Sequence, residues 1–401
     1  MMIQTIRFCI WFVFVCVAFC VRHSDCIQRR NNTFIYGTRN NTATRKPRFS
    51  MSLNSTEDNL LKRNKTFLTD VRSYTSGRRP RITILQLMSP LSTADNCQTS
   101  SGLIGSCLSA QDCMKRGGRG VETCAWGLGV CCVYMSSCDS TSSANLTYFT
   151  SPGYPNSWSS SSGVCTFTMR PRLFSRICQL RLDFEEFYIT GPSAGMCSTD
   201  LLAVSGQDLN NIVPVICGIN TGQHMYLQVG SSTGPFRITI TTSGESEERK
   251  WKIRVTQIPC GSNALAPAHC LQYFTGAVGQ IQSFNYGNIK SIEENTYFLK
   301  MNYAICIRKE ASMCGATFTS EGDFNVNVWN STINCSNDYL SFGTSRKCGK
   351  IRKEDLQAIK LANTGPMIVT FVSDDKHTTS SIASDSGFNF KYTQFACSSG
   401  M

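Results

Sequence analysis

The chain has 401 residues, a formal net charge of +12 and 22 cysteines, while only 16% of its residues are charged. A typical domain takes about 100–200 residues, so this length predicts two or three domains. So many cysteines argue against a cytosolic enzyme, and the composition argues against a mainly helical bundle. They favour an extracellular protein built from small, disulfide-bonded, β-rich modules.

The N-terminus has the pattern of a signal peptide, which we expect to span residues 1–20. Arg7 precedes an apolar run of about 14 residues that ends at Val21, and this run is shorter than the ~20 residues of a membrane span. Ala18 and Cys20 are the small residues expected just before a cleavage site. The sequence therefore predicts a secreted, extracellular protein without a membrane span, and an uncleaved anchor is the alternative.

Residues 21–96 are expected to form a disordered basic arm. They contain 14 Lys or Arg against 5 Asp or Glu, and they have too little apolar surface to offset the entropy of ordering. The basic clusters at residues 45–48 and 78–81 predict either binding to sulfated glycans or cleavage by basic-specific proteases, and a solvated linker is the plainer alternative. Nucleic acid is not an expected partner, because the arm would be extracellular and has few aromatic residues among its charges.

Sequons of the form N-x-S/T predict glycosylation of a secreted chain, although chance matches mean that not every one need carry a glycan. The acceptor residues are Asn31, Asn40, Asn54, Asn64, Asn145, Asn330 and Asn334.

Eighteen cysteines fall into three sets of six after the arm. The first set lies in a glycine-rich segment, residues 97–132, which is too short to build a hydrophobic core and needs disulfides for stability. Six cysteines allow fifteen pairings, and the spacing alone does not choose among them. The adjacent Cys131 and Cys132 are not expected to pair with each other, because that ring would be strained. A zinc site is disfavoured, since the compartment is oxidising and no Cys-x-x-Cys pair occurs in the segment.

The other two sets mark an internal repeat. The numbers of residues between successive cysteines are 26, 12, 18, 19 and 42 in residues 138–260, and 35, 7, 20, 12 and 48 in residues 261–397. This shared order of long and short spacings predicts two domains of about 120–130 residues. Apolar residues alternate with other residues in both, for example over residues 180–184 and 367–371. The period of two, with Gly/Ser/Asn-rich turns, predicts an all-β protein with two β-sandwiches.

Short sequence blocks within the repeat resemble the CUB domain, which implies jelly-roll-like β-sandwiches. The first repeat has YFTSPGYPNSW at 148–158, LRLDFEEFYI at 180–189, CSTDL at 197–201 and CG at 217–218. The second has a degenerate opening, SFNYGN at 283–288, and then CSNDYL at 335–340, CG at 348–349, FVSD at 371–374 and GFNFKY at 387–392. The segment 97–132 resembles the clip domain of arthropod serine proteases. It resembles still more closely the short cysteine segment that precedes CUB domains in secreted arthropod proteins.

These resemblances imply nine disulfides. The clip pattern implies Cys97–Cys131, Cys107–Cys124 and Cys113–Cys132. The CUB pattern implies Cys138–Cys165, Cys197–Cys217, Cys270–Cys306 and Cys335–Cys348. The cysteines that remain would pair as Cys178–Cys260 and Cys314–Cys397, tying an inner strand of each sandwich to its last strand.

The CUB resemblance also raises calcium, which many CUB domains bind through one Glu and two Asp. In the first domain Asp200 matches the first Asp position. The expected Glu falls on Thr190, and the expected Ser-Asp pair falls on Ser231-Ser232. One carboxylate of three does not make a site, so we expect no calcium there.

The second domain retains two of the three carboxylates. Asp338 and Asp374 both match, with Asp375 adjacent, and the expected Glu falls on Asn330, which is also a sequon. Calcium needs about six oxygen ligands, and its affinity follows their charge. We favour two loop aspartates that only make turn hydrogen bonds, and we expect calcium binding to be absent or no tighter than millimolar.

A serine protease must also be weighed, because clip domains usually precede one. His269 lies in a faint likeness to the histidine motif of trypsin-like enzymes, and Ser386 in a faint likeness to the serine motif. The serine motif lacks its flanking glycines, and the residues between the two are filled by CUB cysteine blocks. The sequence therefore predicts no enzyme.

The sequence thus predicts an extracellular, non-catalytic recognition protein that binds proteins or glycans through its CUB domains. The alternative is a non-catalytic regulator or cofactor of an extracellular serine-protease cascade, docked through the clip-like segment. The identity of the partner does not follow from the sequence.

Overall fold

The computed structural model describes residues 96–159, 162–172, 176–245, 248–287, 295–326, 335–362, 365–376 and 385–397. The expected signal peptide and all of the expected arm except its last residue lie outside this part of the chain. So do six of the sequons, those at Asn31, Asn40, Asn54, Asn64, Asn330 and Asn334. Across the described ranges no helix has the length and apolar character needed to cross a membrane.

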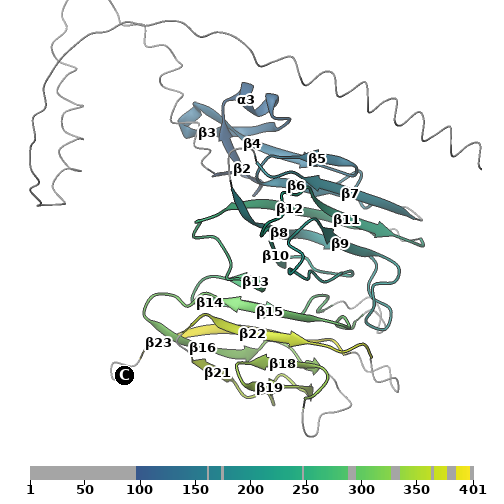
Figure 1. Ribbon diagram of the computed structural model, residues 1–401, viewed down its shortest axis with the longest axis vertical. Helices are drawn as coiled ribbons and strands as arrows, with labels where there is room; N and C mark the ends of the chain where they lie inside the picture. The colour runs from purple at the N-terminus through teal and green to yellow at the C-terminus, as the bar shows by residue number, and fades with distance from the viewer. Residues whose placement is uncertain are drawn as a thin grey trace, which may run out of the picture. The chain divides into compact units, whose positions relative to one another are not determined.

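Two facing sheets make up the first sandwich (Figure 1). One has the strand order β1-β2-β4-β6-β12-β8-β10, with β3 paired to β4, and the other has the order β5-β7-β11-β9. Phe149 of the first sheet and Phe167 of the second stack at a ring-centroid distance of 5.5 Å, so the core lies between the sheets. The strands are β1 (Asn96–Gln98), β2 (Ile104–Leu108), β3 (Arg119–Cys124), β4 (Gly129–Ser136), β5 (Ser140–Ser142), β6 (Thr147–Thr150), β7 (Gly163–Met169), β8 (Ile177–Tyr188), β9 (Leu201–Ser205), β10 (His224–Gln228), β11 (Phe236–Thr242) and β12 (Lys250–Pro259).

The second sandwich has the same two-layer construction. Its sheets run β13-β15-β22-β18-β19 and β14-β23-β16-β21, and a short pair, β17-β20, accompanies them. Phe318 and Phe342, one from each sheet, meet at a ring-centroid distance of 5.0 Å. The strands are β13 (Cys270–Phe274), β14 (Val278–Gln282), β15 (Asn302–Ile307), β16 (Met313–Ser320), β17 (Phe324–Val326), β18 (Tyr339–Phe342), β19 (Ser345–Lys347), β20 (Gly349–Ile351), β21 (Ile359–Ala362), β22 (Met367–Val372) and β23 (Asn389–Ala396).

The alternating pattern of the sequence explains these strands. Successive side chains of a strand point to opposite faces, so a strand with one face on the core alternates buried and exposed residues. Trp251, Ile253 and Val255 of β12 are fully buried, while the residues between them are partly exposed. The expectation of an all-β protein with two sandwiches is therefore confirmed.

The six-cysteine segment shares a sheet with the first sandwich. β4 pairs antiparallel with β2 and β3 inside the segment, and its residues 134–136 pair in parallel with β6. The Tyr148 hydroxyl of β6 accepts a hydrogen bond from the Ile104 N–H at 2.7 Å and donates one to the Ile104 carbonyl at 3.2 Å. The six-cysteine segment has one α-helix among the described residues, α3 (Ala110–Lys115), and Ser109 is its N-cap. The boundary at residue 132 is thus not a break in the hydrogen-bonded sheet.

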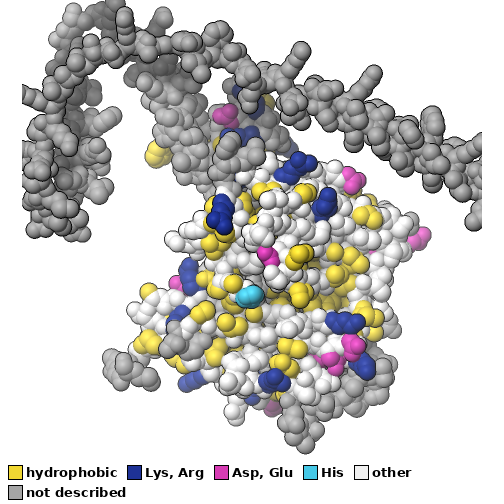
Figure 2. All heavy atoms as spheres, viewed as in Figure 1, with side chains coloured by type: hydrophobic (Ala, Val, Ile, Leu, Met, Phe, Trp, Pro, Cys, Tyr) yellow, Lys and Arg dark blue, Asp and Glu magenta, His cyan; other side chains and the backbone are white. Residues whose placement is uncertain are grey.

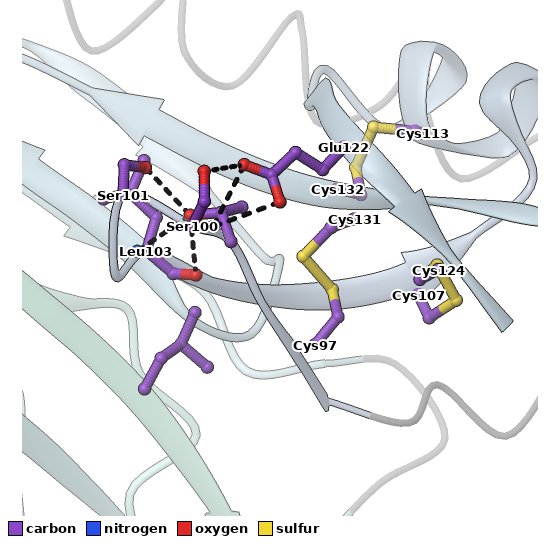
Figure 3. Close-up of a disulfide and its surroundings, with 12 residues drawn as sticks. Cys97, Ser100, Ser101, Leu103, Cys107, Cys113, Glu122, Cys124, Cys131 and Cys132 are labelled. Carbon is purple, nitrogen blue, oxygen red and sulfur yellow. Dashed lines mark hydrogen bonds between the residues drawn. A yellow bond between two sulfur atoms is a disulfide. The ribbon is translucent and has the colours of Figure 1, made fainter. Parts of the chain in front are cut away.

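Nine disulfides connect cysteines within the described ranges, and their partners are those that the resemblances imply. Three lie in the six-cysteine segment (Figure 3): Cys97–Cys131, Cys107–Cys124 and Cys113–Cys132. Three lie in the first sandwich: Cys138–Cys165, Cys178–Cys260 and Cys197–Cys217. Three lie in the second: Cys270–Cys306, Cys314–Cys397 and Cys335–Cys348. Figure 3 also shows the Glu122 carboxylate accepting hydrogen bonds from the Ser100 N–H and hydroxyl.

Candidate functional site

The two sandwiches each place a buried aspartate at the same structural position. Asp200 directly precedes β9, and Asp338 directly precedes β18. Their exposed fractions are 0% and 3%, so neither is an ordinary surface carboxylate. A buried carboxylate needs hydrogen-bond donors or a cation beside it, and the two domains meet this need differently.

Asp200 is paired with a fully buried arginine, Arg249, directly before β12. The Arg249 Nε donates to Asp200 Oδ2 at 2.7 Å, and Nη2 donates to Oδ1 at 2.8 Å. Nη2 also donates to the carbonyl oxygens of Ser243 and Gly244, at 2.9 and 3.0 Å. The Thr190 N–H donates to Oδ2 at 2.8 Å. Charge and hydrogen-bonding capacity are both balanced inside the protein.

One sequence assignment at this position is wrong. The structure places Thr242-Ser243, and not Ser231-Ser232, at the end of the strand beside Asp200, where the Ser243 N–H faces Asp200 Oδ1. Ser373-Asp374 follow the equivalent strand, β22, beside Asp338. Ser232 instead donates its hydroxyl proton to the Gly206 carbonyl in a different loop. Spacing along a Gly/Ser-rich stretch does not fix strand register, whereas the pairing of β11 with β7 and β9 does.

Asp338 accepts hydrogen bonds from two neutral donors. The Tyr297 hydroxyl donates to Asp338 Oδ2, and the Asp374 N–H donates to Oδ1 at 2.6 Å. Asp374 in turn uses its own Oδ1 to accept the Lys376 N–H at 2.8 Å. The structure therefore brings Asp338 and Asp374 close together, as two ligands of one metal ion would be. Their contact, however, is a hydrogen bond from the Asp374 backbone N–H.

The residues around Asp338 do not fit a calcium cage. Nowhere in the described ranges do three or more His, Cys, Asp or Glu side chains gather in a way that could hold a metal ion. Calcium needs free oxygen lone pairs, whereas the two Asp338 oxygens accept hydrogen bonds from a hydroxyl and an amide. Asp375 is exposed, and Asn330 lies outside the described residues. Calcium binding by Asp338 and Asp374 thus gains no support from this geometry.

The residues of the faint protease motifs have other surroundings. His269 is exposed in the connection before β13, and the Ser386 hydroxyl accepts a hydrogen bond from the Asn325 Nδ2 at 2.9 Å. In the Asn145 sequon, the side-chain oxygen accepts the Gln257 N–H at 2.6 Å. A glycan would be attached at the side-chain nitrogen, so glycosylation of Asn145 stays a prediction.

Sequence reasoning missed a buried polar contact between the sandwiches, which we call the domain seam. Hydrogen bonds join three residues of the first domain to three of the second. They are Gln179, His224 and Asn220 in the first, and Ala266, Tyr273 and Asn285 in the second. Gln179 binds Ala266 through both the N–H and the carbonyl, each at 2.8 Å. The Tyr273 N–H donates to His224 Nε2 at 3.0 Å, and the Asn285 N–H donates to Asn220 Oδ1 at 2.9 Å. Glutamines and asparagines are too common in polar chains to signal such a contact.

One loop of the first sandwich exposes two large aliphatic side chains, Leu209 at 98% and Ile212 at 87%. The Asp208 N–H donates to the Gln228 carbonyl at 2.9 Å, and the Gln228 N–H donates to Asn211 Oδ1 at 2.8 Å. Because Gln228 ends β10, the loop is fixed to a strand. Figure 2 shows hydrophobic side chains grouped on one face of the described part, where charged side chains are scattered. Exposed apolar side chains on a fixed loop are typical of protein-binding surfaces.

Two family models match the chain. One, described as "CUB domain", matches residues 138–255, and the other, described as "Animal CUB domain", matches residues 267–395. Together they span more than half of the chain, and each spans one of the two sandwiches.

Solved structures similar to the chain include the CUB1-EGF-CUB2 domains of rat MASP-1, at 16% identity over 65% of this chain and 100% of that one, with a TM-score of 0.23. The CUB1-EGF-CUB2 domain of human MASP-1/3 has 17% identity over 62% of this chain and 99% of that one, with a TM-score of 0.24. The full extracellular region of zebrafish Gpr126/Adgrg6 has 13% identity over 66% of this chain and 38% of that one, with a TM-score of 0.25. TM-scores of this size carry no argument. No curated protein matches the chain.

Proposed function

This chain belongs to the CUB-domain proteins, and from that premise we propose that it is an extracellular, non-catalytic recognition protein that binds another protein or a glycan. CUB domains are typically interaction modules, and no enzyme family is indicated. The nine disulfides are consistent with an oxidising compartment outside the cell.

The observation that carries the proposal is the fixed loop with Leu209 and Ile212. Leu209 and Ile212 lie three residues apart on this loop and are nearly fully exposed, and apolar surface gathered on an ordered loop favours contact with a partner. Burying both against a partner would remove apolar surface from water without a large cost of ordering, because Asp208 and Asn211 already hold the loop.

Affinity capture from the fluid that contains the protein tests this proposal. The full chain is compared with the double variant Leu209→Ser/Ile212→Ser and with Val278→Ser, which removes a side chain that is 54% exposed on the second sandwich. Partners retained by the wild type and by Val278→Ser should be lost with the double variant. If all three proteins retain the same partners, this loop is not part of the recognition surface.

The second candidate function is a non-catalytic regulator or cofactor of an extracellular serine-protease cascade. The observation that favours it is Trp126, which is 102% exposed and has a left-handed φ of 53° in the turn that follows Cys124. Leu128, two residues later, is 55% exposed. Trp is among the commonest energetic anchors of protein interfaces. In the same capture, loss of clip-domain proteases with Trp126→Ser would favour the cascade role, and their absence from every eluate would speak against it.

The arm adds a proposed contact with sulfated glycans, which its charge of 14 Lys or Arg against 5 Asp or Glu supports. Deleting residues 27–90 should weaken retention on a heparin column, because the deletion removes most of the net charge. Unchanged retention would contradict this electrostatic contribution.

A further inference from the structure

We propose that Arg249 is a built-in cation of the first CUB domain. Its guanidinium stands at Asp200, the only carboxylate of the expected calcium set that this domain retains, and it orders the surrounding loops without any metal ion. The inference concerns loop order and does not depend on which partner the protein binds.

The geometry leaves Asp200 no unmet demand for a cation. A carboxylate has about four lone-pair sites. Arg249 fills two of them with the Nε and Nη2 protons, and the N–H groups of Thr190 and Ser243 add contacts at 2.8 and 3.3 Å. A bidentate pair between planar groups is the strongest arrangement that a carboxylate and an arginine can make. The positive charge that calcium would supply is therefore already present.

Arg249 also joins the same kinds of oxygen that a calcium ion would gather. Besides the carboxylate, Nη2 binds the Ser243 and Gly244 carbonyls, which follow β11. The Arg249 carbonyl accepts the Trp158 N–H at 2.7 Å, which fixes the preceding turn to the start of β12. The stretches around residues 200 and 243 thus meet at the Arg249 side chain, while residue 190 joins them through Asp200 and residue 158 through the Arg249 backbone.

The second domain shows how a domain without this arginine satisfies the same aspartate. Asp338 accepts hydrogen bonds from the Tyr297 hydroxyl and the Asp374 N–H, and both of these donors are neutral. Trp251 of β12 and Phe388, directly before β23, are the first core aromatics in the last segment of their domains, and the residue two before each is Arg249 and Ser386, respectively. The two domains therefore differ in charge at this position, and the sequence shows the difference only once this equivalence is known.

Hydrogen exchange of the full chain tests the proposal, because the Thr190 and Ser243 amides point into the pair and report on it directly. In the wild type, their protection should be the same in millimolar calcium and in excess chelator. In Arg249→Met, their exchange should rise roughly a hundredfold, which corresponds to about 3 kcal/mol at about 1.4 kcal/mol per decade. Arg237→Met, the same change at an exposed position of β11, should leave both amides protected.

Two further variants separate an electrostatic role from a packing role. Asp200→Asn/Arg249→Met removes both charges and should recover part of the protection lost in Arg249→Met, because no unpaired charge stays buried. Arg249→Lys should be intermediate, since one ammonium cannot serve both carboxylate oxygens and two carbonyls. If Arg249→Met does not fold, protection in Arg249→Lys decides the matter. Three results would each overturn the proposal: wild-type amides that exchange faster on chelation, amides of the double variant that exchange as fast as those of Arg249→Met, or amides of Arg249→Lys that stay as protected as in the wild type.

Discussion

Among the described histidines, His224 is the one whose burial couples the stability of the fold to pH. Burial lowers its pKa from 6.5 to about 4, and the positive charge of Arg181 on β8 adds to this effect, while Asp183 opposes it. The neutral ring is required because Nε2 accepts the Tyr273 N–H at 3.0 Å. The single proton of the neutral ring must then be on Nδ1, because Nε2 is the nitrogen that accepts the hydrogen bond.

The first prediction is a loss of stability at mildly acidic pH. The folded pKa of His224 lies below that of the unfolded chain, so the unfolded chain binds more protons between about pH 6.5 and 4. The contribution of neutral His224 to the free energy of unfolding is fully present above that window. It is lost as the pH drops through the window, by up to about 3 kcal/mol at about 1.4 kcal/mol per pKa unit. Urea unfolding at pH 7 and pH 5 measures this loss. His224→Gln, which keeps an acceptor that does not titrate, should flatten the profile, whereas His269→Gln, at an exposed histidine, should not.

The second prediction concerns Asp338 and calcium. Because Tyr297 and Asp374 supply neutral donors, Asp338→Asn should destabilise the full chain equally with calcium and with chelator. Asp375→Asn, at an exposed neighbour, should have little effect under either condition. Melting curves with both variants check this, and calorimetry of the full chain should give no isotherm tighter than the millimolar range. A micromolar isotherm that depends on Asp338 would show that the site does bind calcium.

At the scale of elements, β4 is the strand that joins the six-cysteine segment to the first sandwich. Its residues 134–136 pair in parallel with β6, and the Tyr148 hydroxyl of β6 reaches back to both backbone groups of Ile104. The joint therefore consists of backbone pairing reinforced by one buried tyrosine.

The third prediction removes that reinforcement. Tyr148→Phe should cost about 1–2 kcal/mol in urea unfolding, because the Ile104 N–H loses its 2.7 Å acceptor in a part-buried place. The matched control is Tyr188→Phe, whose hydroxyl makes an exposed 3.3 Å contact with Glu248 and should matter by less than about 0.5 kcal/mol. Equal losses in the two variants would mean that the Tyr148 hydroxyl does not hold the segment.

Elements proved easier to predict than the contacts between them. Alternation at residues 180–184 and 367–371 reflects the period of a strand with one buried face, so the sequence predicts those strands directly. The pairing of β4 with β6 has no local signature, because parallel pairing between them depends on backbone geometry. Arg249 was missed for a related reason: its partner Asp200 lies 49 residues away, and only the folded chain brings them together.

At the scale of the whole described part, the domain seam makes the two CUB domains one unit. The seam buries amide and imidazole groups that hydrogen-bond across it, as in the pairs Gln179–Ala266 and Asn220–Asn285. Separating the domains would leave these groups to water, but a partial shift would leave them buried and unpaired, which costs more. We therefore expect the domains to keep a fixed orientation, so that a partner meets both at once.

The last prediction tests this coupling with two glycines of one loop. Gly218 has a φ of 70°, and a Cβ there would lie 2.0 Å from Asn285 Oδ1, the oxygen that accepts the Ile219 N–H. Gly222 has a φ of 85°, with nothing within 4 Å of an added Cβ. Both alanine variants carry the backbone cost of a left-handed residue, about 1 kcal/mol, so only Gly218→Ala also displaces Asn285. Calorimetry should show one unfolding transition for the wild type and for Gly222→Ala, but a broadened or split transition for Gly218→Ala. Faster amide exchange over residues 283–287 should accompany the split, and identical behaviour of the two variants would show that the seam does not couple the domains.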